Sequence, residues 1–252
     1  MMHLCAELQP RGPARIPGVD VDAYLARLGI AGAVEMSFAG LERLQRAHLT
    51  AVPFENLDVF LRRGVETDPE WSVAKIVDRG RGGWCYELNG AFATLLDRLG
   101  FSVKWLGATV VPVSSPVPDH LAVEVKLDRP YLVDVGFGDS FIRPLPLDVE
   151  GPHDGGSGTY QFDFGDDIIT LVAVDPDGQA PQYRFGGQSF TAEDFEAPSR
   201  RLQTEPGVQW TQSPFATRLL DGGPDRVTLL KDRIKFRRQG GWTEQPVSIG
   251  EE

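Results

Sequence analysis

The run from Arg81 to Gly90 constrains this 252-residue chain more than any other segment. A double glycine is followed by Trp84 and Cys85, and then by apolar residues at helical spacing that end at Gly100. We therefore expect a helix whose first turn holds Cys85. The unpaired N–H groups of a first turn and the helix dipole favour a thiolate over a thiol. Cys85 is therefore a candidate nucleophile.

Composition and charge limit the classes of function. The chain has 41% hydrophobic and 24% charged residues, which is typical of a folded globular protein. A net charge of −11 argues against general binding of nucleic acid or anionic membranes, although a local basic pocket for a phosphate-bearing cofactor is compatible with it. No apolar run approaches membrane-spanning length, and the residues from Met1 to Pro17 do not resemble a signal peptide. These features predict a cytoplasmic protein.

The chain has only two cysteines, Cys5 and Cys85, which do not make a disulfide framework. The sequence leaves open a disulfide between them, which would prevent Cys85 from acting as a nucleophile. A reducing cytoplasm would keep that thiol free. No CxxC motif or Cys/His cluster indicates zinc, and we expect no bound metal.

Helical patterns predominate up to residue 100, and strand patterns follow. Expected helices cover 20–30, 41–49, 69–77 and 85–99, with a short one near 192–198. Segments rich in Val and Leu, separated by turn residues, predict strands at 102–113, 121–127, 130–137, 159–164, 168–174, 182–186, 215–220, 227–230 and 233–237. The glycine-rich segment 151–158 predicts a loop. Helices followed by strands favour an α+β fold over a βαβ parallel sheet.

A cysteine nucleophile needs a base, and the chain has four histidines. His120 begins a strand-like segment after a proline turn, where its ring would be held rigidly. A lone histidine at such a position is more commonly a solvated turn residue, so this pattern alone does not show whether His120 is the base. The other three lie near the N-terminus, on an expected helix and in the glycine-rich loop, at His3, His48 and His153.

Asp134 interrupts an otherwise apolar strand-like segment. Burying an unpaired polar group costs about 2–7 kcal/mol, so this carboxylate needs a partner: a structural arginine, backbone amides, or His120. The short connection at 126–130 predicts a hairpin that brings His120 and Asp134 to the same end. Asp134 would then fix the imidazole tautomer and support an imidazolium paired with the Cys85 thiolate.

Two neighbouring features have both a functional and a structural interpretation. Gly136 and Gly138 would let the backbone approach a ligand closely, or would simply permit a turn. Neither this segment nor the double glycine before Cys85 has Walker or dinucleotide-fold spacing. Glu55 follows a proline in an apolar run, and a buried pair with Arg81 would clamp the nucleophile's loop. Local satisfaction of Glu55 in a turn is the alternative.

Together these motifs resemble the arylamine N-acetyltransferase family. The resemblance is carried by Arg81-Gly-Gly-x-Cys85-x-Glu87-x-Asn89, Val52-Pro-Phe-Glu-Asn56, the His120 strand and Val133-Asp-Val-Gly-Phe-Gly138. It implies a helical bundle at 1–100 carrying the nucleophile, an antiparallel β-barrel at 101–187 carrying the histidine and aspartate, and an α/β lid at 188–252. The implied core is a cysteine-protease-like Cys-His-Asp arrangement.

The resemblance also implies a chemistry. Cys85 would take an acetyl group from acetyl-CoA and pass it to an arylamine, arylhydrazine or arylhydroxylamine, with His120 managing the proton and Asp134 orienting it. The implied partners are coenzyme A and a small aromatic amine or hydrazine, without nucleic acid, membrane or metal. By position, Phe54, Tyr86, Phe137 and Phe215 would line the substrate pocket, although core packing competes with this interpretation. Gly136, Phe137 and Gly138 would bind the cofactor.

Three departures from the family pattern stand out. Trp84 and Asp119 occupy positions where the family more often has other residues, and Asp119 puts a negative charge beside the cofactor route. The resemblance implies a further helix beyond Glu252, so the lid is expected to be short and to admit water to the acyl-enzyme.

Three other functions remain open from the sequence. The first is an amide synthase of macrolactam biosynthesis, which takes an acyl chain from a carrier protein. The second is a cysteine hydrolase or transglutaminase-like enzyme, and the third is a binding protein without catalysis.

Overall fold

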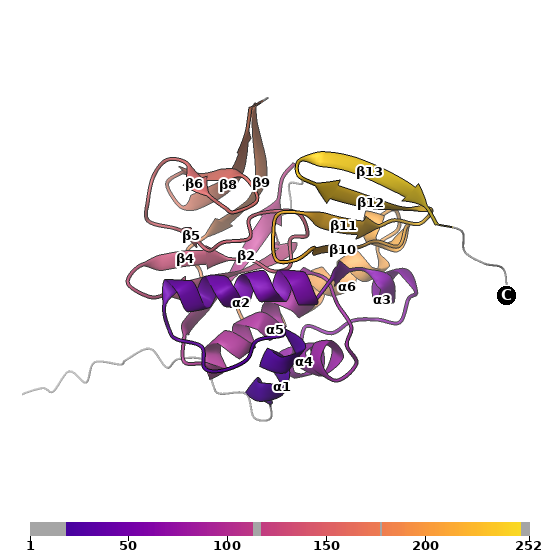
Figure 1. Ribbon diagram of the computed structural model, residues 1–252, viewed down its shortest axis with the longest axis horizontal. Helices are drawn as coiled ribbons and strands as arrows, with labels where there is room; N and C mark the ends of the chain where they lie inside the picture. The colour runs from indigo at the N-terminus through magenta and orange to yellow at the C-terminus, as the bar shows by residue number, and fades with distance from the viewer. Residues whose placement is uncertain (1–18, 113–116, 177, 248–252) are drawn as a thin grey trace, which may run out of the picture.

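The computed structural model describes residues 19–112, 117–176 and 178–247, with most helices in one layer and two antiparallel sheets beside it (Figure 1). The helices are α1 (Val21–Arg27), α2 (Phe38–Ala51), α3 (Leu57–Phe60), α4 (Pro69–Val77), α5 (Cys85–Arg98), α6 (Glu196–Thr204) and the 3-10 turns η1 (Glu193–Phe195) and η2 (Gln209–Thr211). The expected N-terminal helices are confirmed. The sequence missed α3, because a four-residue helix is too short to show a hydrophobic period.

The helix starts follow the local chemistry of the sequence. The Asp20 side chain accepts the Ala23 N–H at 3.0 Å and caps α1. Asp68 caps α4, and Pro69 occupies the first turn, where its missing N–H costs nothing. Helix α5 begins at Cys85, as expected from the spacing.

The larger sheet has eight strands in the order β5-β4-β3-β2-β9-β8-β7-β6. Its strands are β2 (Ser102–Val110), β3 (His120–Lys126), β4 (Pro130–Val133), β5 (Leu145–Pro146), β6 (His153–Asp154), β7 (Thr159–Phe164), β8 (Ile168–Asp175) and β9 (Gly178–Gly186). The Ile142 N–H donates to the Gly155 carbonyl at 2.7 Å, which joins the segments beside the two edge strands. The sheet is therefore a nearly closed antiparallel barrel, and the fold class is α+β as expected.

Strand β3 is buried on both faces, which explains its nearly continuous apolar sequence. Ala122 points into the barrel core, whereas Leu121, Val123 and Val125 belong to the core shared with the helices. Helix α5 packs against β3 and β2. The nucleophile's helix and the histidine's strand are therefore held against each other by one hydrophobic core.

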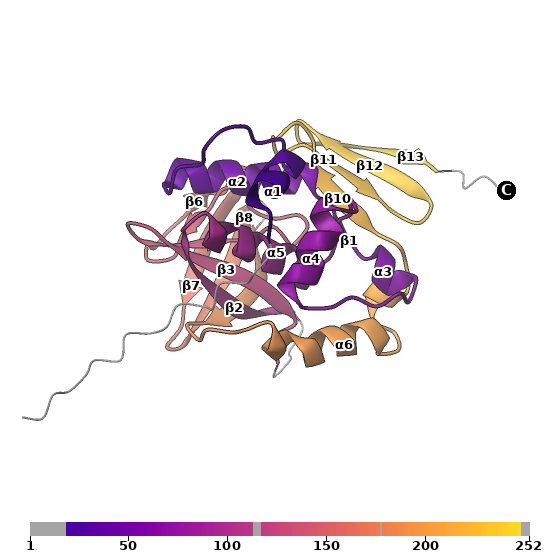
Figure 2. The same cartoon turned by 90° about the horizontal axis from the view of Figure 1, so that it is seen from below.

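The smaller sheet has five strands in the order β1-β10-β11-β12-β13. Its strands are β1 (Phe54–Glu55), β10 (Ala216–Leu219), β11 (Arg226–Leu229), β12 (Arg233–Arg238) and β13 (Gly241–Pro246). Strand β1 pairs antiparallel with β10, with Phe54 opposite Thr217. Strand β1, which lies beside the nucleophile's loop, is thus an edge strand of the C-terminal sheet. Helix α6 lies apart from that sheet (Figure 2).

Three details differ from the expectation. The strand expected at 130–137 ends at Val133, because the chain leaves the sheet at Asp134 and turns through the following glycines. A two-residue strand, β6, lies inside the expected loop 151–158. Strand β13 was missed because its residues are exposed throughout and lack an apolar alternation.

Within the described ranges, no helix combines the length and the apolar character that crossing a bilayer requires.

Candidate active site

The loop before Cys85 is shaped by its glycines. Glu55 N–H donates to the Gly83 carbonyl at 2.8 Å, and Gly83 N–H donates to the Pro53 carbonyl at 3.3 Å. A Cβ on Gly82 would overlap the carbonyl oxygen of Pro53. Only a residue without a side chain allows the two backbones to run this close, and their contact fixes the chain direction into α5.

His120 and Asp134 lie together at the same end of the β3–β4 hairpin. The two strands pair with Val123 opposite Val133, so the expected hairpin is confirmed. His120 Nε2 lies 2.7 Å from Asp134 Oδ2, and both side chains are almost fully buried. Cys85 lines the same cavity as His120 and contributes to the raised pKa of this imidazole. The three predicted catalytic side chains therefore lie together.

Asn89 holds Asp134 in place from one turn further along α5. Its Nδ2 donates to Asp134 Oδ1 at 2.8 Å and to the Leu121 carbonyl at 2.6 Å, and its Oδ1 accepts the Val135 N–H at 2.9 Å. The Gly136 N–H also donates to Asp134 Oδ1, at 2.8 Å. The buried carboxylate thus has a partner on each oxygen.

The electrostatics of the pair favour a protonated imidazole. Burial disfavours the charge on His120, but the Asp134 carboxylate, its hydrogen bond and Cys85 outweigh burial and raise the pKa of His120 to about 10. At neutral pH the imidazolium can therefore stabilise a thiolate and later donate a proton.

The glycine turn after Asp134 passes directly over the nucleophile. A Cβ on Gly136 would lie 2.7 Å from the Cys85 Cα and 2.8 Å from the Asn89 Nδ2. Asp139, at the end of this turn, accepts two hydrogen bonds of 2.9 Å from Arg237 and lies 3.1 Å from the buried Arg226. The turn is therefore anchored to the C-terminal sheet.

A cavity of about 620 Å³ opens onto Cys85 and His120, within the range for small-molecule sites. Aromatic rings form much of its wall: Phe54, Trp84, Phe137 and Trp210. Its charged members besides His120 are Asp119 and Arg201. The remaining described residues of its lining are Cys85, Val110, Val111, Pro112, Gly136, Leu202, Val208 and Gln209.

Comparisons with known proteins identify the family. The N-acetyltransferase family model matches residues 37–249. An arylamine N-acetyltransferase of Mycolicibacterium smegmatis is 34% identical over 232 residues, which cover 88% of this chain and 80% of the relative. One of Escherichia coli (strain K12) is 39% identical over 234 residues, with the same coverage. This chain belongs to the arylamine N-acetyltransferase family.

Solved structures of the family share the fold. The Mycobacterium marinum arylamine N-acetyltransferase in complex with CoA superimposes with a TM-score of 0.83 at 30% identity, over 91% of this chain and 87% of that one. The Salmonella typhimurium enzyme gives 0.86 at 28% identity, over 90% and 85%. The fold is the cysteine-protease-like fold of these N-acetyltransferases.

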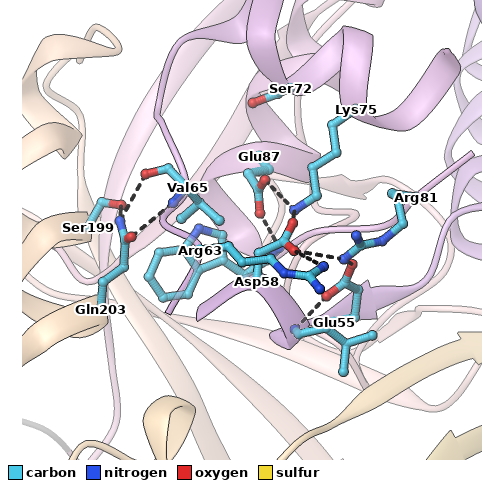
Figure 3. A network of polar contacts seen from close by, with 12 residues as sticks. Glu55, Asp58, Arg63, Val65, Ser72, Lys75, Arg81, Glu87, Ser199 and Gln203 are labelled. Atoms are coloured by element: carbon cyan, nitrogen blue, oxygen red, sulfur yellow. Dashed lines mark hydrogen bonds and ion pairs between the residues drawn. The ribbon is translucent and has the colours of Figure 1, made fainter. Parts of the chain in front are cut away.

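A buried network of charges surrounds the start of the nucleophile's helix in this N-acetyltransferase chain (Figure 3). Lys75 Nζ lies 2.7 Å from Glu87 Oε1 and 2.8 Å from Asp58 Oδ2. Arg81 Nη2 lies 2.7 Å from Glu55 Oε1 and 3.3 Å from Asp58 Oδ1. The sequence suggested the Arg81–Glu55 pair but missed Lys75 and Asp58, although a lysine on the apolar face of α4 was a signal.

Glu87 is the most deeply buried carboxylate of this network. Burial, with a smaller contribution from Glu55, raises the pKa of Glu87 to about 7, against the opposing effects of Lys75 and of the Trp84 N–H that Glu87 accepts at 3.1 Å. By contrast, Lys75 and Arg81 outweigh burial and lower the pKa of Asp58.

Three of the predicted pocket residues do not line the cavity. The ring of Tyr86 is 1% exposed and packs between Trp84 and Phe195. Phe215 packs against the edge of Phe54, at 5.9 Å between ring centroids, so it supports the wall without forming it. Gly138 is not part of the lining and lies against Phe54 and Thr217. Phe54, Gly136 and Phe137 do line it, as expected.

The sequence also missed the C-terminal wall of the cavity. Arg201 and Leu202 of α6 and Trp210 of η2 approach Cys85 only through folding, because more than one hundred residues separate them from it. Asn56 positions that wall: its Nδ2 donates to the carbonyls of Trp210 and Ser213, both at 2.8 Å. No sequence period or motif marked these contacts.

The other candidate residues have different surroundings. His48 hydrogen-bonds the Tyr24 hydroxyl at 3.0 Å, and burial lowers its pKa to about 3. His153 contacts the Val149 carbonyl at 3.0 Å. His3 and Cys5 lie outside the described residues. Among residues 19–112, 117–176 and 178–247, no three His, Cys, Asp or Glu side chains are grouped so that they could hold a metal ion.

Proposed function

We propose that the chain transfers an acetyl group from acetyl-CoA to an arylamine, arylhydrazine or arylhydroxylamine through an acetyl-Cys85 intermediate. The observation that carries this proposal is the His120–Asp134 contact of 2.7 Å beside a free Cys85 in the first turn of α5. The relatives named arylamine N-acetyltransferases, and a related structure described as a complex with CoA, support it.

In the first half of the reaction, the Cys85 Sγ attacks the thioester carbonyl carbon. The bond from that carbon to the sulfur of CoA breaks, and the His120 imidazolium gives its proton to the departing thiolate. Asp134 holds the ring through Nε2, so that Nδ1 faces the reacting atoms. The products are acetyl-Cys85, a neutral imidazole and free CoA.

In the second half, the amine nitrogen attacks the acetyl carbon of acetyl-Cys85. The neutral His120 accepts the proton that this nitrogen loses, and the Cys85 thiolate leaves. The resulting imidazolium restores the starting ion pair. The buried position of His120, 2% exposed, limits competition from water for the same proton.

The cavity fits the two substrates in turn. Phe54, Phe137 and Trp210 offer flat apolar surfaces for an aromatic ring, and Tyr86 and Phe215 support that wall from behind. We assign Gly136, Phe137 and Gly138 to coenzyme A, since Gly136 and Phe137 line the cavity beside Cys85 and Gly138 continues the same turn. When bound, acetyl-CoA supplies the activated acetyl group, and the protein supplies the nucleophile and the protons.

We propose that the chain is divided into three functional segments. Residues 1–100 carry Cys85, residues 101–187 carry His120 and Asp134, and residues 188–252 cover the cavity as a lid. The Arg81–Glu55 pair clamps the nucleophile's loop, and β1 links this loop to the lid through its pairing with β10.

Acyl labelling tests this function directly. Acetyl-CoA alone, under reducing conditions, is expected to add one acetyl mass to the peptide that contains Cys85, and Cys85→Ala abolishes the addition. Adding aniline or phenylhydrazine then removes the label and yields the acetylated product. Unlabelled wild type would refute acetyl-CoA as donor. Labelling only by a carrier-bound acyl chain would instead indicate an amide synthase.

A further inference from the structure

Arg201 brings a positive charge to the wall of the catalytic cavity. It lies on α6 and lines the same cavity as Cys85 and His120. Around it the wall consists largely of aromatic and aliphatic side chains. A charged ligand bound in this cavity would displace water from the wall, and its charge would then interact with Arg201 more strongly than in bulk water.

The guanidinium is only partly engaged by the protein. Arg201 Nη1 lies 2.8 Å from Glu205 Oε2, and these two side chains are 39% and 48% exposed, so solvent weakens that pair. The Nε atom is buried and has no hydrogen-bond partner among the described residues. A guanidinium offers five N–H donors in a planar fork that matches a carboxylate. The hydrogen bond to Glu205 uses Nη1 alone, and the described residues make none to Nη2, so this outer amino group is available to an anion.

Asp119 supplies the opposite charge within the same cavity. Asp119 directly precedes His120 in the chain. Its Oδ1 accepts the Val110 N–H at 2.8 Å, and this hydrogen bond holds the carboxylate in position. The ion pairs of the described residues include none between Asp119 and Arg201. The cavity therefore presents two separate charges rather than one neutral pair.

Both charges act close to the nucleophile. Burial raises the pKa of the Tyr86 hydroxyl, Cys85 and Asp119 raise it further, and Arg201 lowers it. Tyr86 follows Cys85 in α5, and its hydroxyl is buried without a hydrogen-bond partner among the described residues. Arg201 and Asp119 thus lie within electrostatic range of the same residue at the start of α5.

We propose that Arg201 is a specificity residue that binds a carboxylate on the aromatic amine acceptor, on the side of the ring away from the amine. Asp119 repels that carboxylate from the end of the cavity at His120 and so directs the amine toward acetyl-Cys85. This inference rests on the proposed acetyl transfer. Phosphate groups of coenzyme A are a second source of the same anionic chemistry, and the test separates the two.

A matched pair of acceptors provides the test. 4-Aminobenzoate and 4-aminobenzamide have nearly the same shape and differ in charge. With acetyl-CoA as donor, Arg201→Gln is expected to lower the ratio of kcat/KM for the acid to kcat/KM for the amide by about tenfold or more. Most of the change falls in KM for the acid, and Arg201→Lys restores part of the ratio. Arg200→Gln, which alters the neighbouring arginine outside the cavity lining, leaves the ratio as in wild type.

Binding measured without turnover keeps this inference separate from the proposed function. Trp84 and Trp210 line the cavity, so quenching of tryptophan fluorescence reports acceptor binding in the absence of acetyl-CoA. If the wild type discriminates acid from amide in binding but transfers no acetyl group, the Arg201 assignment stands and the proposed function fails. An unchanged acid-to-amide ratio in Arg201→Gln, in both kinetics and binding, overturns the assignment. A raised KM for acetyl-CoA with both acceptors overturns it in favour of the phosphates of coenzyme A.

Discussion

Lys75 and Glu87 form a buried ion pair two residues along the helix from the nucleophile. Lys75 Nζ lies 2.7 Å from Glu87 Oε1, and the two side chains are 2% and 1% exposed. Glu87 also accepts the N–H of Trp84, the residue that precedes Cys85. The pair therefore connects α4 to the first turn of α5. Cys85 is thus held in position by polar contacts as well as by the hydrophobic core.

Removing the Lys75 charge is expected to destabilise the fold. Lys75→Gln removes the cation that pairs with both Glu87 and Asp58. Breaking a buried ion pair by removing one partner lowers the free energy of unfolding by about 3–5 kcal/mol. Arg63→Gln is the control, since Arg63 reaches Asp58 only at 3.7 Å and is 63% exposed, and its loss should be about 1 kcal/mol or less. Urea denaturation measures both, and equal losses would contradict the role of burial.

Neutralising both members of the pair is expected to recover part of that loss. In Lys75→Gln/Glu87→Gln the two amides can hydrogen-bond each other, and no uncompensated carboxylate remains at position 87. The double variant should therefore be more stable than the sum of the single losses predicts, by about 1 kcal/mol or more. A double-mutant cycle from urea denaturation measures the coupling, and strictly additive losses would show that the two side chains do not interact.

Glu87 is also expected to make stability depend on pH. Its pKa is raised from 4.5 to about 7, so its favourable contribution is complete below pH 4.5 and is lost as pH rises through 7. A shift of this size corresponds to about 3 kcal/mol. Glu87→Gln cannot titrate, so the stability of the wild type relative to this variant should fall between pH 4.5 and 8. Denaturation curves across that range would refute the account if the difference stayed constant.

The site was predictable where chemistry is local in sequence. Cys85 follows a double glycine and begins a helical period, and Asp134 stands out as a carboxylate in an apolar strand. The proximity of His120 followed from the hairpin, because its short connection fixed which ends meet. These predictions needed only periodicity, turn chemistry and the cost of a buried charge.

The rest depended on tertiary contacts that leave no local mark. Arg201 and Trp210 reach the cavity because the C-terminal segment folds back over Cys85. Tyr86 was expected in the pocket from its position, but its ring packs against Trp84 and Phe195 instead. The direction in which a helical ring points is decided by its neighbours, here Trp84 and η1, and not by its spacing from Cys85.

A methyl group at Gly136 is expected to slow acetylation of Cys85. The added Cβ would lie 2.7 Å from the Cys85 Cα, so the turn or the helix must shift. Displacements of about 1 Å at a reacting centre cost on the order of 100-fold in rate. Rapid-mixing measurement of CoA release should show this loss for Gly136→Ala. Gly187→Ala, whose Cβ would meet nothing within 4 Å, is the control. Equal rates in the two variants would contradict the close approach.

Asp134→Asn is expected to keep the fold and remove most of the activity. The amide cannot support the imidazolium of His120, and comparable substitutions cost about 10⁴-fold in kcat. Asp148→Asn, at a carboxylate that is 46% exposed, is the control and should react like wild type. The rate of Cys85 alkylation by iodoacetamide at pH 7, followed by mass spectrometry, measures the effect on the nucleophile itself. Undiminished alkylation in Asp134→Asn would show that His120 does not need this partner.

The same variant is expected to change how stability depends on pH. In the wild type the pKa of His120 is raised from 6.5 to about 10, so its contribution to stability is complete below pH 6.5 and is lost as pH rises through 10. Without the Asp134 charge the main cause of that shift is absent. The excess stability of the wild type over Asp134→Asn should therefore be largest near pH 6 and shrink toward pH 10. Thermal unfolding at several pH values tests this, and a difference that grows with pH would mean that His120 is neutral in the native protein.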